Sequence, residues 1–408
     1  MRFAGKLLAG CAMALLSGAA AIAETKPPLK IGVLDDLSGP YEDVSGKGSV
    51  IAAQLAAEDM KEVLGRKVEI VFADHTNKAD VGAPIAKRWF DVDGVDMVTG
   101  LGNSAVALGV RNVAANAGKI DIVVNAGSSD FSGKFCSPTS FHWVYDTYGL
   151  AKTIGTATIR SGAKSFYMIL VDYGVANALQ RDGTQFATAA GGKSAGSIRV
   201  PLNNKDYSSF ILQAQGSSAD AILLGIAGAD LVNFIKQARE FGVSQDKTKM
   251  ASFLSYINDV RGLGIDAAQG LLLSEAFYWD QDEKSRAFAR RFYERAKKMP
   301  NGMQAGVYSA VNHYLKAVQA AGTTDTKAVV SKIRELPVND FMSDNVKVRE
   351  DGRAARPMYL YQVKKPGEPK GEWDVMTPIQ KLSAEEATRP LSESECSFVQ
   401  KTGAQQGK

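Results

Sequence analysis

Short apolar runs alternate with amphipathic stretches along this chain. Residues 29–34 (Leu-Lys-Ile-Gly-Val-Leu) form the first run, and a Ser-Gly-Pro-Tyr loop follows at 38–41. A helix is predicted over 46–64, because Ile51 and Leu55 then share one face. Strands that alternate with helices in this way are typical of βαβ units. The pattern therefore predicts an α/β fold with mainly parallel sheets.

The same alternation continues far along the chain. Further strands are predicted at 68–73, 96–99, 121–124, 165–171, 195–200, 219–224 and 271–273. Further helices are predicted at 81–90, 104–115, 148–160, 177–189, 207–215, 230–241, 283–298 and 304–321. Late loops are expected at Pro337 and at the charged stretch 364–372.

The N-terminus has the composition of a secretory signal. Arg2 and Lys6 precede an apolar run over 7–22, and small residues stand at a cleavage site after Ala23. We therefore expect residues 1–23 to be a cleaved signal peptide and the mature protein to be periplasmic. The alternative is a lipoprotein box ending at Cys11, which would leave a lipidated N-terminus.

Length and charge restrict the class of protein. Residues 24–408 exceed what a single core usually supports, so two domains are expected. The chain has 48 basic and 44 acidic side chains. Of the basic side chains, only those of Arg2 and Lys6 lie in the leader. A mature chain this close to neutral gives no electrostatic reason to bind nucleic acid or an anionic membrane.

Two cysteines remain in the mature chain. Because an exported protein folds in an oxidising compartment, a disulfide between Cys136 and Cys396 is expected. Two unrelated free thiols are the alternative. A bridge would attach the C-terminal tail to the body of the protein.

Motifs for catalysis or metal binding are missing from the sequence. His75, His142 and His313 are far apart and lack the spacing of zinc ligands. No GxSxG or GxxxxGK motif occurs. A Ser/His/acid triad, whose members meet only in the fold, stays open as an alternative. We expect no cofactor and no enzyme activity.

Two loops after predicted strands carry small and hydroxyl residues. Residues 100–105 (Gly-Leu-Gly-Asn-Ser-Ala) open a helix, and residues 126–129 (Ala-Gly-Ser-Ser) follow the next strand. A helix N-terminus has free N–H groups that hold an anionic oxygen. Both loops are thus predicted to bind a carboxylate, unless they are plain tight turns with helix caps. The first, with Asp121 further on, also matches a dinucleotide fingerprint, which we weigh as the lesser alternative.

Aromatic residues also follow predicted strands. Tyr41, Tyr173, Tyr256 and Trp279 lie in such loops, where a ring gives apolar contact and one polar group. The alternative is that they are ordinary core residues.

Further short motifs occur in a specific order and spacing, at residues 31–33, 37–40, 103–104, 125–129, 172–174, 206–210, 235–238 and 241–242. Together they resemble the periplasmic solute-binding proteins of ATP-driven importers, in particular the leucine/isoleucine/valine-binding family. The likeness covers residues 29 to about 380.

The resemblance implies two doubly wound lobes that are joined by three crossovers and close on a ligand. It places residues 29–144 and 276–348 in the first lobe and residues 145–275 and 349–385 in the second. Residues 386–408 are then a C-terminal tail.

The resemblance also implies a ligand site. Ser104, Gly127 and Ser129 match the residues that hold a carboxylate, and Tyr173 matches the tyrosine that covers the ligand. The full candidate set is Tyr41, Asn103, Ser104, Gly127, Ser128, Ser129, Tyr148, Tyr173, Ala227, Tyr256 and Trp279.

One departure from the family pattern concerns the ligand. Amino-acid binders place an acid opposite the α-ammonium, in the stretch that matches 253–256, but here no acid occurs before Asp259. An unpaired buried ammonium would cost several kcal/mol. We therefore expect a small organic acid, with aromatic carboxylates as candidates. The alternative is a branched-chain or other amino acid, with Asp146, Asp230 and Asp280 as the first acids to examine.

The predicted function is capture of a small molecule for the permease of an ABC importer by a monomeric protein. A secreted enzyme or a ligand sensor on the same fold is the alternative from another class.

Overall fold

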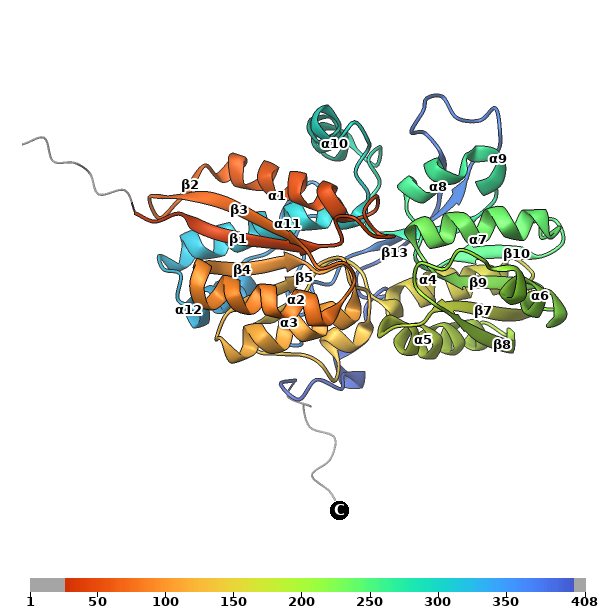
Figure 1. Cartoon of the computed structure of the whole chain (residues 1–408), viewed down its shortest axis with the longest axis horizontal. Coiled ribbons are helices and arrows are strands. Elements are labelled where there is room, and N and C mark those ends of the chain that lie inside the picture. Colours follow the sequence, from red (N-terminus) through yellow and green to blue (C-terminus); the bar gives the residue numbers. More distant parts are fainter. Residues whose placement is uncertain (1–25, 400–408) are drawn as a thin grey trace, which may run out of the picture.

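The computed structural model of the protein describes residues 26–399 and contains two α/β lobes side by side (Figure 1). The predicted leader and the alternative lipidation site at Cys11 lie outside the described residues. Across residues 26–399, no helix combines the length and the apolar character that a membrane span requires.

The first lobe is built on a six-stranded sheet with the order β2-β3-β1-β4-β5-β6. Apart from the β2–β3 pair, neighbouring strands are parallel. Its strands are β1 (Leu29–Asp35), β2 (Glu62–Val63), β3 (Arg66–Asp74), β4 (Val95–Gly100), β5 (Ile120–Val123) and β6 (Ser140–His142). Central strands such as β1 are buried almost throughout, as expected for a parallel sheet covered on both faces.

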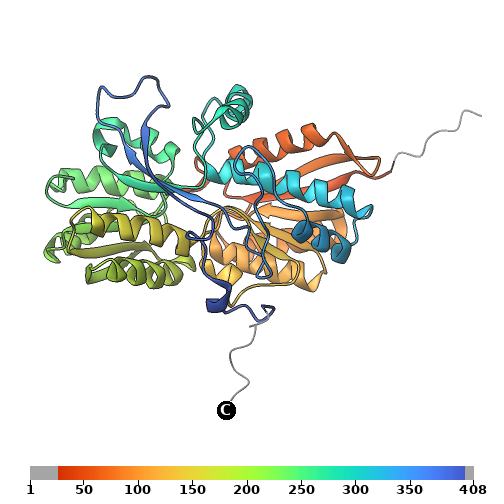
Figure 2. The same ribbon diagram turned by 180° about the vertical axis from the view of Figure 1, so that it is seen from behind.

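Helices cover both faces of this first sheet. The helices of the first lobe are α1 (Gly46–Met60), α2 (Ala79–Arg88), the π-helix η1 (Trp89–Asp93), α3 (Ser104–Asn116), the 3₁₀ helix η2 (Ser129–Ser132), α10 (Glu283–Ala296), which packs on α1, α11 (Gly302–Ala321) and α12 (Thr326–Glu335). Helices α2 and α3 lie on the face seen in Figure 1, whereas α11 and α12 lie on the face seen in Figure 2.

The second lobe is built on a seven-stranded sheet with the order β13-β12-β11-β10-β9-β7-β8. Its strands are β7 (Ser165–Val171), β8 (Lys193–Val200), β9 (Ala221–Gly225), β10 (Lys249–Ser252), β11 (Leu272–Glu275), β12 (Met358–Val363) and β13 (Met376–Leu382). The last two strands are antiparallel, and the predicted loop at 364–372 joins them.

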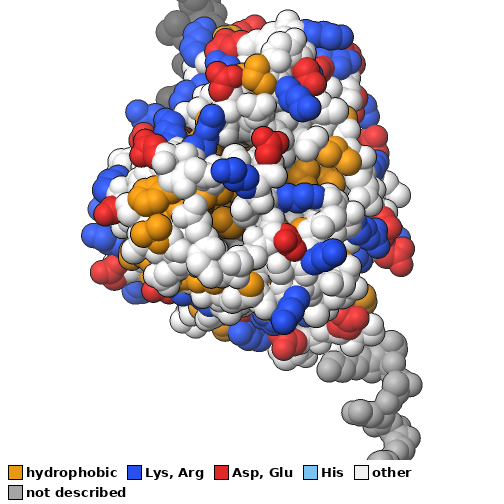
Figure 3. All heavy atoms as spheres, turned by 90° about the vertical axis from the view of Figure 1, so that its right-hand side faces the viewer, with side chains coloured by type: hydrophobic (Ala, Val, Ile, Leu, Met, Phe, Trp, Pro, Cys, Tyr) orange, Lys and Arg blue, Asp and Glu red, His pale blue; other side chains and the backbone are white. Residues whose placement is uncertain are grey.

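The helices of the second lobe complete the same layered arrangement. They are α4 (Thr147–Arg160), α5 (Val175–Ala189), α6 (Ser208–Gly216), α7 (Gly228–Glu240), α8 (Ile257–Leu263) and α9 (Ile265–Ala268), with a last 3₁₀ helix, η3 (Leu391–Glu393), in the C-terminal segment. On the end of this lobe that Figure 3 shows, side chains of both charge signs are interspersed. The predicted class, two doubly wound lobes with mainly parallel sheets, is confirmed.

The chain passes between the two sheets three times. It leaves the first sheet after β6 to enter α4, returns after β11 to form α10, and crosses again after α12 to form β12. The residue bounds given above for each lobe stay predictions.

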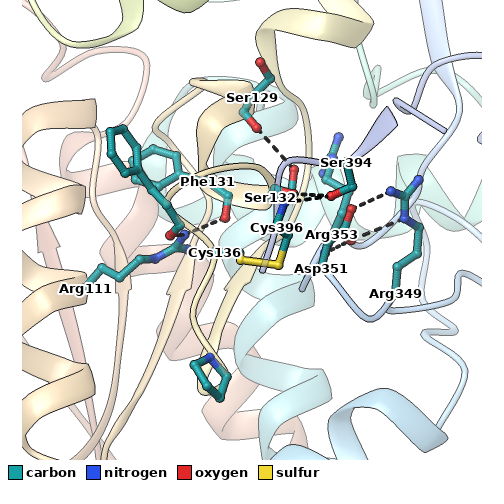
Figure 4. The surroundings of a disulfide bond; sticks show 12 residues. Arg111, Ser129, Phe131, Ser132, Cys136, Arg349, Asp351, Arg353, Ser394 and Cys396 are labelled. Atoms are coloured by element: carbon teal, nitrogen blue, oxygen red, sulfur yellow. Dashed lines mark hydrogen bonds and ion pairs between the residues drawn. A yellow bond between two sulfur atoms is a disulfide. The ribbon is translucent and has the colours of Figure 1, made fainter. Parts of the chain in front are cut away.

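The predicted disulfide between Cys136 and Cys396 is present (Figure 4). It joins residues separated by 260 positions in the sequence and fixes the C-terminal segment to the first lobe. The same segment also contacts the second lobe, because Arg389 forms an ion pair with Asp182 of α5 at 3.1 Å. The backbone carbonyl of Arg389 accepts a hydrogen bond of 2.7 Å from Arg349.

Candidate functional site

A cavity lies between the two lobes, beyond the carboxyl ends of their parallel strands. Most of its lining comes from loops that follow β1, β4 and β5 in the first lobe and β7, β9 and β10 in the second. Ligands of open α/β sheets bind at this edge. The lining residues are Tyr41, Ser45, Gly102, Asn125, Gly127, Tyr145, Tyr173, Val175, Ala227, Leu254, Tyr256 and Met303.

The two walls of the cavity are close together. Its free volume is about 20 Å³, little more than one water molecule needs. Tyr41 of the first lobe and Tyr173 of the second share a hydroxyl–hydroxyl hydrogen bond of 3.2 Å. The backbone N–H of Ala229 donates to the carbonyl of Pro40, also across the lobes, at 3.0 Å. The structure is therefore a closed form, and a solute enters only when the lobes separate.

Several helices point their N-terminal ends at this cavity. Ser45 and Ala227 are the N-cap residues of α1 and α7, Val175 is the first residue of α5, and Met303 is the second residue of α11. Gly102 lies just before α3. A helix N-terminus carries roughly half a positive charge. None of the described residues that line the cavity has a charged side chain, so these ends are the positive groups that favour an anion there.

Three buried acids lie behind the lining. Asp35 accepts from the backbone N–H of Gly102, Asp259 from that of Tyr256, and Glu275 from those of Ile257 and Gly302. Burial raises the pKa of Asp35 to about 6. Burial likewise raises the pKa values of Asp259 and Glu275 to about 8. Each acid thus accepts hydrogen bonds from backbone N–H groups and does not line the cavity.

The three histidines are buried and separate. His142 and His313 place Nε2 against the carbonyls of Ala126 and Ile333. Burial lowers the pKa values of His75 and His313 to about 4, so both are neutral at physiological pH. Within residues 26–399, no group of three or more His, Cys, Asp or Glu side chains is arranged to hold a metal ion.

A family model described as periplasmic binding protein matches residues 28–369 of the chain. The chain belongs to this family. It is similar to the crystal structure of a periplasmic binding protein from Burkholderia mallei, with 40% identity, a TM-score of 0.89, and coverage of 91% of this chain and 99% of that one. It is also similar to a branched chain amino acid ABC transporter periplasmic ligand-binding protein from Burkholderia xenovorans, at 37% identity, a TM-score of 0.81 and coverage of 91% and 100%.

More distant relatives extend the comparison. A Leu/Ile/Val-binding protein homolog of Brucella abortus is 28% identical over 207 residues, 50% of this chain and 52% of the relative, so the match spans about half the length of that curated protein. A solute binding protein from R. palustris, solved in complex with benzoate, has the same fold at 18% identity, a TM-score of 0.80 and coverage of 91% and 99%. The family and the similar structures are binding proteins rather than enzymes.

The cavity of this periplasmic binding protein brings together five of the predicted site residues: Tyr41, Gly127, Tyr173, Ala227 and Tyr256. Ser104 is buried and its Oγ has no partner among the described residues, but it is not part of the lining. Asn103 caps α3 through its Oδ1, and Ser128 Oγ accepts from the N–H of Asp130.

Three other predicted residues have partners elsewhere. Ser129 Oγ donates to Asp182 at 2.7 Å and lies in an interlobe cluster with Arg181. Tyr148 packs edge-to-face on Phe186. The indole N–H of Trp279 donates to the carbonyl of Trp373 at 3.0 Å. None of these three lines the cavity, and we leave them out of the proposed site.

Seven lining residues were not predicted: Ser45, Gly102, Asn125, Tyr145, Val175, Leu254 and Met303. Gly102 lies inside the 100–105 loop that was predicted to bind a carboxylate, and Asn125 lies inside a stretch that carries the family resemblance, so their positions after strands could have identified them. Met303 comes from α11, far along the chain, and no local pattern indicates it.

Proposed function

We propose that this protein is the solute-binding component of an ABC importer, which captures a small organic carboxylate between its lobes and delivers it to a membrane permease. The observation that carries the proposal is an interlobe cavity that is lined by helix N-termini and tyrosines, with no charged side chain among its described lining residues. The family match and the similarity to the ABC transporter protein from Burkholderia xenovorans support the transport role.

The electrostatics of the cavity favour a carboxylate. The first turns of α1, α3, α5, α7 and α11 face it. Each such end stabilises an anion by up to about 2 kcal/mol in partly buried geometry. No cationic side chain is needed under these conditions, as in other anion sites at helix N-termini.

The same ends disfavour an amino acid. An α-ammonium in the closed cavity would need a carboxylate partner, and no acid is among the described residues that line the cavity. Asp146 pairs with Arg353, and Asp280 pairs with Arg286 at the surface. Asp230 lies in the first turn of α7 outside the lining, where one oxygen accepts from the backbone N–H of Asn203 and the other is buried without a partner among the described residues. Desolvation of an unmatched ammonium is expected to cost several kcal/mol.

The rings of the cavity favour an aromatic solute among the carboxylates. Tyr41, Tyr145, Tyr173 and Tyr256 give it four aromatic walls. Aromatic pairs contribute about 0.5–1.5 kcal/mol beyond the area that they bury. The benzoate complex of the R. palustris protein supports this ligand class through a shared fold.

The proposal predicts that a carboxylic acid without an α-amine binds at least about tenfold more tightly than the matching amino acid, a difference of roughly 1.4 kcal/mol. Calorimetric titration of phenylpyruvate against phenylalanine, and of 2-oxoisocaproate against leucine, measures this difference. Micromolar binding of an amino acid whose deaminated partner fails to bind would refute the ligand assignment and return it to the amino-acid alternative.

A further inference from the structure

Asn125 has an unusual position in the lining of the cavity. It follows β5, and its side chain is only 2% exposed. Its Nδ2 donates to Asp35 Oδ2 at 2.5 Å and to Ser49 Oγ at 3.0 Å. Both amide hydrogens are therefore used, because an NH₂ group has two. Its Oδ1 is buried and has no hydrogen-bond partner among the described residues.

The surrounding groups fix which way this amide points. Turning it over would place Oδ1 against Asp35 Oδ2, so that two acceptors would face each other. Asp35 is itself held in place, since its Oδ1 accepts from the backbone N–H groups of Asp36 and Gly102. Ser49 also hydrogen-bonds Asp35. Asp35 and Ser49 thus act as positioning residues that keep Nδ2 on their side and leave Oδ1 as an acceptor.

A buried acceptor without a partner has lost its hydrogen bonds to water and gained none in return, which is unfavourable. A bound solute that supplies a donor would remove this cost, whereas a solute without one would keep it. The donor that fits is a neutral hydroxyl, because the helix N-termini around the cavity oppose an ammonium and no carboxylate lines the cavity among the described residues.

We propose that Asn125 Oδ1 accepts a hydrogen bond from a hydroxyl group of the solute, so that the protein selects hydroxylated carboxylic acids over their unsubstituted counterparts. This inference rests on the proposed function and narrows its ligand class. Asn125 is then a specificity-determining residue, oriented by Asp35 from behind the cavity wall.

Calorimetric titration of matched acids tests the inference. The probes are benzoate with its 2-, 3- and 4-hydroxy derivatives, and 4-methylpentanoate with its 2-hydroxy derivative. In the wild-type protein, the best hydroxy acid of a series is expected to bind at least about tenfold more tightly than its parent acid, since satisfying the acceptor removes the burial cost. Asn125→Leu should bring this ratio to within about twofold, chiefly by weakening the hydroxy acid.

Ser252→Ala is the matched control. Ser252 Oγ is also buried and without a partner among the described residues, but it lies outside the cavity lining. The variant should keep the wild-type ratio. A ratio that falls equally in both variants would overturn the assignment to Asn125.

A pH series on the wild-type protein tests the orientation even if Asn125→Leu fails to fold. Burial raises the pKa of Asp35 to about 6. Asp36 and His75 also face Asp35, with His75 Nε2 3.9 Å from Asp35 Oδ1, and burial lowers the pKa of His75 to about 4, so His75 stays neutral through this range. Below about pH 6, a protonated Asp35 can donate to the amide oxygen and lets the amide turn over. The preference for the hydroxy acid should therefore be full at pH 8 and decline as the pH falls through about 6.

Other outcomes separate the two proposals. Equal binding of parent and hydroxy acids, or a ratio that is unchanged in Asn125→Leu, overturns this inference and leaves the carboxylate assignment intact. Binding of phenylalanine or leucine with no binding of any acid refutes the proposed ligand class, and the inference with it.

Discussion

Exchange of Gly228 for alanine is expected to weaken solute binding by about 10- to 100-fold, since overpacking a tight contact costs about 1–3 kcal/mol. Gly228 begins α7 in the second lobe and has a φ of +59°. A Cβ atom there would lie 2.3 Å from the carbonyl oxygen of Pro40 in the first lobe and 3.3 Å from Tyr41 Cδ1. Both neighbours belong to the closed interface, so the extra methyl group would hold the lobes apart.

Gly242→Ala is the control for the backbone cost of this exchange. Gly242 also has a positive φ, +76°, but a Cβ there would meet no atom within 4 Å. Both variants therefore place a side chain in the left-handed region, which lowers the folding stability by about 1 kcal/mol. Calorimetry should find near wild-type affinity for Gly242→Ala. Equal losses of affinity in the two variants would show that closure at Pro40 does not govern binding.

Loss of the Cys136–Cys396 disulfide should lower the free energy of unfolding by about 3–5 kcal/mol, because the bridge closes a very long loop in the unfolded chain. The two cysteines are 260 positions apart, and the bridge joins the C-terminal segment to the first lobe. Urea unfolding of the Cys136→Ser/Cys396→Ser double variant measures the loss.

Ser394→Ala separates the covalent contribution from the local contacts. Ser394 lies two residues before Cys396. Its Oγ donates to the carbonyl of Ser132 at 3.5 Å and accepts from the backbone N–H of Cys396 at 3.2 Å. Removal of these two long hydrogen bonds should cost about 1 kcal/mol, less than loss of the bridge. A double cysteine variant that is as stable as Ser394→Ala would contradict the prediction.

Much of the fold could be predicted from the sequence, because the hydrophobic residues of its strands and helices follow simple periods. The strand β7 is an almost continuous apolar run, β1 is apolar apart from Lys30 and its last residue, and the helices between the strands show apolar faces. Two of the elements that were not predicted, β13 and β6, lack such signals. In β13, only the two end residues are buried and Pro378 interrupts the strand, so its sequence does not alternate. The strand β6 is three residues long and contains His142, which makes it too short for a periodic pattern.

The residues of the site could be predicted only in part, for a different physical reason. Loops after parallel strands must meet at one edge, so Tyr41, Gly127 and Tyr173 could be placed in the cavity. Which way a side chain turns depends on partners from distant segments. Trp279 turns to the carbonyl of Trp373, and Ser129 turns to Asp182, neither of which a local pattern reveals.

The central claim, that the lobes close on a carboxylate, is tested most directly by thermal unfolding of the purified protein with a panel of solutes. The panel contains aromatic acids, aliphatic acids, the matching amino acids, and amides. A solute that binds only the folded state at about 100 times its dissociation constant adds about 2.7 kcal/mol of stability. We predict that carboxylic acids without an amine raise the melting temperature most. A panel in which no such acid raises it while an amino acid or an amide does would contradict the account.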